Sequence, residues 1–174
     1  YEYGSVRARR MLDSEGLDVA LVNMNYYNIE KYNRLKMMED QTILCVSHTH
    51  RLAKEKYVTF DMLSDEKLIM YNTDSAQNDM ILSRFHSMQI QPNILMYCSQ
   101  LYTTLNFVRK GDCAAFLYSS LAVNPRDFVQ IPLEPRLSTD FGMIWKKDAF
   151  TPLRTSKFID FASGYDITPY LPTL

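Results

Sequence analysis

Short runs of apolar residues recur along the chain and predict most of its β-strands. The runs are continuous rather than alternating, which is typical of strands buried on both faces of a sheet that helices cover. They lie at residues 17–22, 42–47, 67–71, 93–98, 114–118, 128–133 and 141–145. One more strand is expected to end at Gly4, within the opening YEYGS. The pattern therefore predicts a helix-covered sheet, the arrangement of an α/β protein.

Helical periodicity fills several of the gaps between these runs, and each predicted helix has a start or stop signal. The residues expected to face inward are Ala8, Met11 and Leu12 after Ser5; Ile81, Phe85 and Met88 after Ser75; Leu101, Leu105 and Val108 after Ser99; and Leu153, Phe158 and Phe161 after Thr151. Residues 67–118 thus alternate strand, helix, strand, helix, strand. This order predicts two successive βαβ units with parallel pairing and right-handed crossovers.

Composition and charge exclude several classes of protein. The 174 residues are 47% hydrophobic, which is enough to fill a core. The chain carries 19 Lys+Arg against 20 Asp+Glu and has no solid basic run, so this piece lacks the charge pattern of a nucleic-acid surface. Cys45, Cys98 and Cys113 lie in apolar runs without CxxC spacing, which predicts buried, reduced thiols and a reducing compartment. No run approaches 18 apolar residues, so no membrane span is expected.

Polar side chains gather where the predicted strands end. Ser5 follows the first strand, Thr73 and Ser75 the strand at 67–71, Ser99 and Gln100 the strand at 93–98, and Tyr118 with Ser119 and Ser120 the strand at 114–118. In an open α/β sheet, ligands bind outside the carboxyl ends of the strands, where helix N-termini present free N–H groups. We therefore expect a small, polar, anionic ligand, whereas a buried acid at Asp74 would favour an amine-bearing one. Each hydroxyl taken alone is explained equally well as a helix cap or turn residue.

Other candidate chemistry is weak. His48 and His50, two residues apart, have no nearby cysteine or carboxylate triad, so no metal site is expected. Cys98 or Cys113 would need a neighbouring base and some exposure to act as a nucleophile, and both lie in apolar strands. The residues at the strand ends are mostly hydroxyls and amides, which suit binding better than catalysis. The sequence therefore predicts no catalytic residue, metal or cofactor.

Several stretches, in order and at the right spacing, resemble the effector-binding (regulatory) domain of LysR-type transcriptional regulators. SEGLDVALVN is similar to the family's G-x-LD-x-A-I/L-V strand, and LCVSHTHRLAKEKYVTFDMLSDEKLIMY to its V-x-x-HPLA…V-x-x-x-DLxxEPLI stretch. NFVRKGDCAAFLYSSLA resembles VxxGxGIAxLPxxLA, and IPLEPRLSTDFGMIWKKD with the later FIDF resembles the return crossover and last helix. Thr49 departs from the family by replacing the usual proline after His48.

The resemblance implies the fold of type 2 periplasmic binding proteins, in which two Rossmann-like α/β lobes are joined by two crossover strands. Residues 1–46 and 140–174 would form lobe I, and residues 47–139 would form lobe II. The family's domain opens with a strand and helix that lobe I would lack here. Members also carry an N-terminal winged helix-turn-helix, so about 120 further residues are expected upstream.

The resemblance also implies that the domain binds a small-molecule effector in the cleft between its lobes and so controls DNA binding and transcription by the full-length protein. The ligand-binding residues carried over are Ser5, Asn23, Ser75, Ser99, Gln100 and Tyr118, and Thr73 joins them because of its position at a strand end. Implied partners are the effector, further copies of the chain in a homodimer or homotetramer, DNA through the absent N-terminal domain, and RNA polymerase, all in the cytoplasm. In the dimer, the helices at 5–15 and 75–88 would meet across a two-fold axis. The alternative is a secreted solute-binding protein of the same fold.

Overall fold

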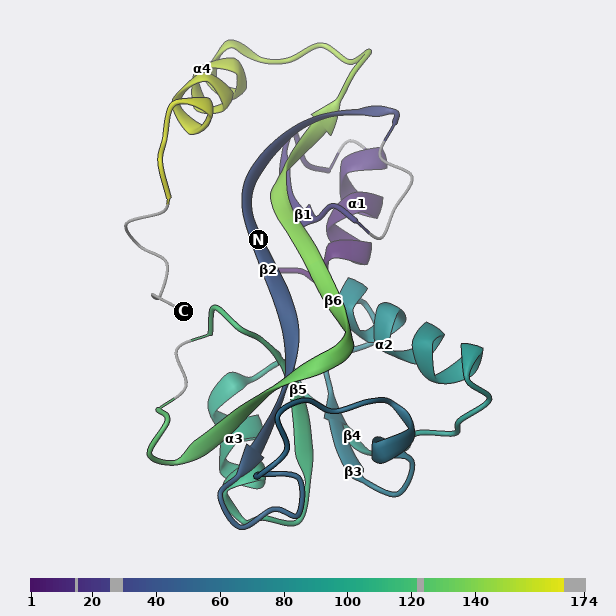
Figure 1. The fold of residues 1–174 in the computed structure, drawn as a ribbon. Helices are drawn as coiled ribbons and strands as arrows, with labels where there is room; N and C mark the ends of the chain where they lie inside the picture. Colours follow the sequence, from purple (N-terminus) through teal and green to yellow (C-terminus); the bar gives the residue numbers. More distant parts are fainter. Residues whose placement is uncertain (15, 26–29, 122–123, 168–174) are drawn as a thin grey trace. The chain divides into compact units, whose positions relative to one another are not determined.

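The computed structural model describes residues 1–14, 16–25, 30–121 and 124–167, which form an α/β fold as predicted (Figure 1). Its helices are α1 (Ser5–Asp13), α2 (Ala76–Ser87), α3 (Leu101–Arg109), α4 (Leu153–Ser163) and the short 3-10 helix η1 (Asp61–Leu63). Its strands are β1 (Ala20–Asn23), β2 (Tyr32–Ser47), β3 (Lys67–Met70), β4 (Asn93–Tyr97), β5 (Ala114–Tyr118) and β6 (Phe128–Lys146). Within these described ranges, no helix is both long and apolar enough to cross a membrane.

The chain divides into two compact units that share two long strands. Unit 1 comprises Tyr1–Glu39 with Thr139–Thr173, and unit 2 comprises Asp40–Ser138. Strand β2 passes from unit 1 to unit 2 after Glu39, and β6 returns after Ser138. Strand β6 is continuous, although the sequence predicted separate strands at 128–133 and 141–145. The prediction divided it because its middle residues are largely exposed and break the apolar pattern.

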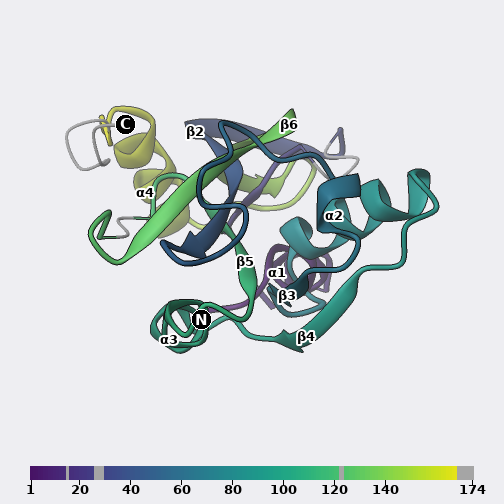
Figure 2. The same ribbon diagram turned by 60° about the horizontal axis from the view of Figure 1, so that its bottom comes forward.

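The sheet of unit 2 contains the two predicted βαβ units. Strand β3 lies between β4 and β5 and pairs parallel with both, which confirms the predicted pairing, while β5 pairs antiparallel with β2. Helices α2 and α3 lie on opposite faces of this sheet (Figure 2). On β5, Phe116 joins the core under α2, and Leu117 joins the core under α3. Burial on both faces explains why the unit 2 part of β2, β3 and β5 are continuously apolar, whereas β4 alternates between exposed and partly buried residues.

Three aromatic rings hold together the core under α2. Phe60, Phe85 and Phe116 are almost completely buried, and the rings of Phe60 and Phe85 meet edge to face with their centroids 4.8 Å apart. Phe60 comes from the long connection between β2 and β3, so this packing binds the connection to the sheet. Aromatic pairs of this geometry stabilise a core by about 1 kcal/mol beyond their buried area.

Unit 1 has a smaller core. Strand β1 pairs antiparallel with β6, and α1 packs Ala8 and Leu12 against β1, as expected from the sequence (Figure 1). The predicted strand ending at Gly4 is wrong, because residues 1–4 adopt no regular structure. A strand forms only where a neighbouring strand receives its backbone hydrogen bonds, and residues 1–4 have no such neighbour among the described strands.

The predicted orientation of α4 is also wrong. Leu153, Phe158 and Phe161 were expected to face inward, but they are 71%, 48% and 63% exposed. The helix instead buries Thr155 and Ala162. Thr155 donates a hydrogen bond from Oγ1 to Asp18 Oδ2 at 3.1 Å, and this bond holds the face of α4 that contains Thr155 toward the rest of unit 1. Met88, expected on the inner face of α2, is 43% exposed at the end of that helix.

Gly142 of β6 provides a test of the packing in unit 1. A Cβ atom at this position would overlap the backbone oxygen of Leu35 and lie 2.6 Å from Met24 Sδ. We expect Gly142→Ala to lower the free energy of unfolding by about 1–3 kcal/mol because the backbone oxygen cannot move aside. Gly164→Ala is the control, since its nearest atom would lie at an ordinary 3.8 Å. Urea unfolding that gave equal stabilities for the two variants would contradict this description.

Candidate functional site

The carboxyl ends of β3, β4 and β5 bring five of the predicted site residues to one edge of the unit 2 sheet. Thr73 and Ser75 follow β3, Ser99 and Gln100 follow β4, and Tyr118 is the last residue of β5. The three strands are adjacent and parallel, so their carboxyl ends lie side by side. This is the edge at which open α/β sheets bind ligands.

Ser75 is the only one of the predicted serines that is itself a helix N-cap. Its Oγ accepts a hydrogen bond from the Gln77 backbone N–H at 3.2 Å at the start of α2. Ser99 is exposed and precedes Gln100, which is the N-cap of α3 but makes no capping bond with its side chain. The N-terminus of α2 is therefore the best ordered of these helix starts.

Two amide side chains that the sequence analysis missed lie in the first turn of α2. Gln77 and Asn78 are each 1% exposed. The Gln77 Nε2 donates to Thr42 Oγ1 at 3.3 Å, and the Asn78 Nδ2 donates to the backbone oxygen of Tyr71 at 2.6 Å. Within the described part of the chain, their carbonyl oxygens are buried without a hydrogen-bond partner. A buried acceptor in that state is costly and marks a place where a donor is needed.

Asp40 organises the end of β5. This residue is 7% exposed, and its carboxylate accepts hydrogen bonds from Ser119 Oγ at 2.6 Å and from Ser120 Oγ at 2.5 Å. The backbone N–H groups of Gln41 and Ser120 also donate to it, at 2.7 and 3.2 Å. The two hydroxyls after Tyr118 thus bind a side chain of β2. An acidic residue just before an apolar run gave no sequence signal that it would be buried.

Two tyrosines lie beside this carboxylate. The rings of Tyr71 and Tyr118, at the ends of β3 and β5, stack with their centroids 6.1 Å apart. Burial raises the pKa of Tyr71 to about 12, and the nearby charges of Asp40 and Cys98 add to the effect. We call the set formed by Asp40, Thr42, Tyr71, Ser75, Gln77, Asn78 and Tyr118 the strand-end group.

The remaining predicted site residues, Ser5 and Asn23, meet within unit 1. The backbone N–H of Asn23 donates to Ser5 Oγ at 3.1 Å, and Asn23 Nδ2 lies 3.5 Å from Thr139 Oγ1. Asn23 is completely buried, so its amide orders the end of β1. Ser5 is the first residue of α1 and connects this helix to that strand end.

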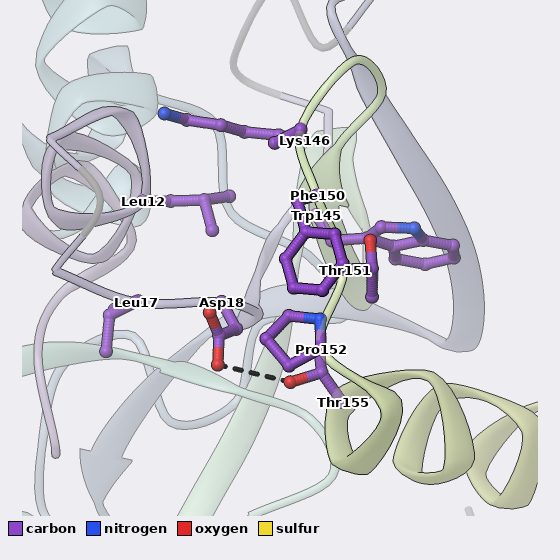
Figure 3. A pocket seen from close by; sticks show the side chains of 10 residues that line it. Leu12, Leu17, Asp18, Trp145, Lys146, Phe150, Thr151, Pro152 and Thr155 are labelled. Carbon is purple, nitrogen blue, oxygen red and sulfur yellow. Dashed lines mark hydrogen bonds between the residues drawn. The ribbon is translucent and has the colours of Figure 1, made fainter.

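Unit 1 also contains a pocket of about 350 Å³ that includes none of the residues predicted to bind a ligand (Figure 3). Leu12, Leu17, Phe150 and Pro152 supply apolar walls, and Asp18 and Lys146 supply charges. Both charged groups already have partners, because Asp18 accepts from Thr155 and Lys146 Nζ donates to the Asp13 backbone oxygen at 2.9 Å. The pocket therefore combines apolar walls with two charged groups that already bond other parts of unit 1.

The histidines and cysteines have structural surroundings. His50 is buried with its Nε2 3.0 Å from Glu66 Oε2, and His48 Nε2 lies 3.0 Å from the Pro125 backbone oxygen. In the ranges that the structure describes, no three His, Cys, Asp or Glu side chains are grouped as a metal site requires. Burial raises the pKa of Cys45 to about 12 and that of Cys113 above its ordinary value, which disfavours a reactive thiolate.

Comparisons with known proteins agree on one family. Residues 2–165 match the sequence model described as LysR substrate binding domain. The HTH-type transcriptional regulator YwbI of Bacillus subtilis (strain 168) is 22% identical over 167 residues, which cover 94% of this chain and 55% of that protein. The chain therefore spans about half the length of this curated relative.

Solved structures of similar fold include two regulatory domains. The CcmR regulatory domain of Synechocystis PCC6803, in complex with 2-PG, has a TM-score of 0.79 and 12% identity, covering 94% of this chain and 80% of that one. The QuiR effector binding domain, in complex with shikimate, has a TM-score of 0.78 and 21% identity, covering 95% and 79%. At these identities the likeness extends to the fold alone.

Ser119 tests the role of Asp40 as a local anchor. We expect Ser119→Ala to lower the free energy of unfolding by about 2 kcal/mol, because hydrogen bonds to charged groups are stronger than neutral ones. Thr73→Ala, at an exposed position on the same edge, should change it by less than about 0.5 kcal/mol. Chemical denaturation measures both, and equal stabilities would argue against the anchor.

The raised pKa of Tyr71 predicts that the free energy of unfolding depends on pH in the alkaline range. Its folded-state pKa lies above the ordinary value of 10.0, so the neutral phenol favours the folded state below pH 10 and this advantage is lost as the pH rises toward about 12. Over that interval the wild type should lose about 1.4 kcal/mol per pH unit more than Tyr71→Phe. Urea unfolding at pH 10 to 12 gives both slopes, and parallel slopes would refute the shift.

Proposed function

We propose, because this chain belongs to the LysR substrate binding domain family, that it is the effector-sensing part of a longer transcriptional regulator. The observation that carries the proposal is the family match over residues 2–165 of 174. The fold is the type 2 periplasmic-binding-protein kind found in such domains. DNA binding would belong to the part of the regulator outside this chain, in keeping with its coverage of 55% of the relative YwbI.

Effector sensing fits this chain better than the two alternatives, which are catalysis and the binding of solutes by a secreted protein. Catalysis by Cys45 or Cys113 is disfavoured because burial raises the pKa of both thiols. A secreted solute-binding protein would share the fold, but the matching family model and the relative YwbI favour a regulator. We accordingly place the regulator in the cytoplasm, as a homodimer or homotetramer that acts on DNA and contacts RNA polymerase.

The proposed effector site uses the residues predicted from the sequence. In unit 2 these are Thr73, Ser75, Ser99, Gln100 and Tyr118, and in unit 1 they are Ser5 and Asn23. The N-terminus of α2 suits an anionic group because its first N–H groups carry partial positive charge. The effector would be small and polar with an acidic group, as suggested by the 2-PG and shikimate complexes of the similar domains. Its location in a cleft between lobes stays a prediction.

Ser75→Ala tests the site in the full-length regulator, screened against organic acids, amino acids and inorganic anions. A ligand at a hundred times its Kd should stabilise the wild-type protein by about 2.7 kcal/mol and raise the Tm by several degrees. Ser75→Ala should reduce this shift, because it removes a hydroxyl contact and a cap, and should cost the free protein about 1 kcal/mol.

Ser87→Ala is the matched control, because Ser87 lies at the other end of α2, where its Oγ bonds the Arg84 backbone oxygen. It should leave the ligand shift unchanged. An equal ligand shift in wild type and Ser75→Ala would count against the site. A full reading frame with a secretory leader instead of a helix-turn-helix would count against the regulator itself.

A further inference from the structure

The carboxylate of Asp40 is buried without a cationic partner. Its four donors are two serine hydroxyls and two backbone N–H groups, all uncharged. Across the described residues, no ion pair joins Asp40 to a lysine, arginine or histidine. Charges buried in proteins are as a rule paired with an opposite charge, and in the described part of the chain the negative charge of Asp40 has no such partner.

The same group has spare acceptors and few donors. Gln77 Oε1 and Asn78 Oδ1 are buried without partners in the described part of the chain. Thr42 lies two residues beyond Asp40 on the same face of β2, about 7 Å away, and accepts a hydrogen bond from the Gln77 side chain. A group with surplus acceptors and a negative charge is complemented by a ligand that donates hydrogen bonds and carries a positive charge.

Two aromatic rings complete this environment. Tyr71 and Tyr118 are half-buried and stacked on each other, and among the described residues no lysine or arginine lies over the Tyr71 ring. The face of a tyrosine ring attracts a cation electrostatically. Because Tyr71, Tyr118 and Ser120 each retain some exposure and Asp40 is 7% exposed, a small ligand can approach the group.

We propose that Asp40 determines effector specificity by pairing with a protonated amine, so that the effector is an amino-acid-like molecule with both an ammonium and an acidic group. This inference rests on the proposed function, which assigns the acidic group to the N-terminus of α2. An ammonium group has three donors and no acceptor, which complements the carboxylate of Asp40. A simple anion would instead meet the carboxylate of Asp40 with its own negative charge.

The experiment compares ligands that differ in one group. Isothermal titration of the full-length regulator uses the proteinogenic amino acids and 4-aminobutyrate, each beside the hydroxy acid and the unsubstituted acid of the same carbon skeleton. We expect an amine member to bind at least tenfold more tightly than its two counterparts. Asp40→Asn should lower the affinity ratio between the amine and its counterparts at least tenfold. Asp127→Asn, which changes an exposed acid paired with Arg109, should preserve this ratio.

A second variant tests the proposal independently in case Asp40→Asn fails to fold. Tyr118→Leu keeps the carboxylate and removes an aromatic face, so it should weaken the amine ligand more than the hydroxy acid. The proposal is overturned if acids without an amine bind as tightly, if no amine in the panel binds, or if Asp40→Asn leaves the preference intact. Loss of binding in Ser75→Ala with an unchanged preference in Asp40→Asn would retain the effector site and reject the ammonium pairing.

Discussion

The hydrogen bonding of the Asp40 carboxylate is the constraint on which the geometry of unit 2 most depends. The β2–β5 ladder reaches the pair Thr42 and Tyr118, and Asp40 extends this attachment by binding the next two residues of the chain, Ser119 and Ser120. Asp40 is also the first residue of unit 2 on β2. One side chain therefore fixes the end of β5 at the point where β2 enters the unit, and it holds Tyr118 against Tyr71. A carboxylate can remain buried there because four donors surround it.

The rest of the strand-end group follows from the layers of the sheet. Helices α2 and α3 cover the two faces of β2, β3 and β5, so apolar side chains fill both faces. Polar side chains have room only where the strands end and the first turns of the helices begin. There the amides of Gln77 and Asn78 bond Thr42 and the Tyr71 backbone, which ties the start of α2 to two strands. The polar edge is thus a consequence of the apolar faces.

Unit 1 uses its polar groups differently. Asn23 bonds both Ser5 and Thr139, which joins the end of β1 to the start of α1 and to the unit 1 part of β6. Helix α4 buries a threonine and an alanine and leaves its larger apolar side chains exposed. The pocket beside it contains charges that are already bonded. In the described part of unit 1, hydrogen bonds of polar side chains therefore connect the helices and strands around a core that is smaller than the cores of unit 2.

The sequence by itself determined the α/β class, the order of the elements from β3 to β5 and the edge at which polar residues gather, because continuous apolar runs and helical spacing depend on local chemistry. It predicted that Thr73, Ser75 and Tyr118 lie at the ends of strands, where the structure has them. It could not identify Asp40, Gln77 or Asn78, because a polar residue is buried or exposed according to contacts with distant parts of the chain. The inner face of α4 was likewise undetermined, since periodicity defines a stripe but not what the stripe meets. Only the tertiary structure brought Asp40 to Ser119, 79 residues away, because that contact exists only once β2 and β5 have paired.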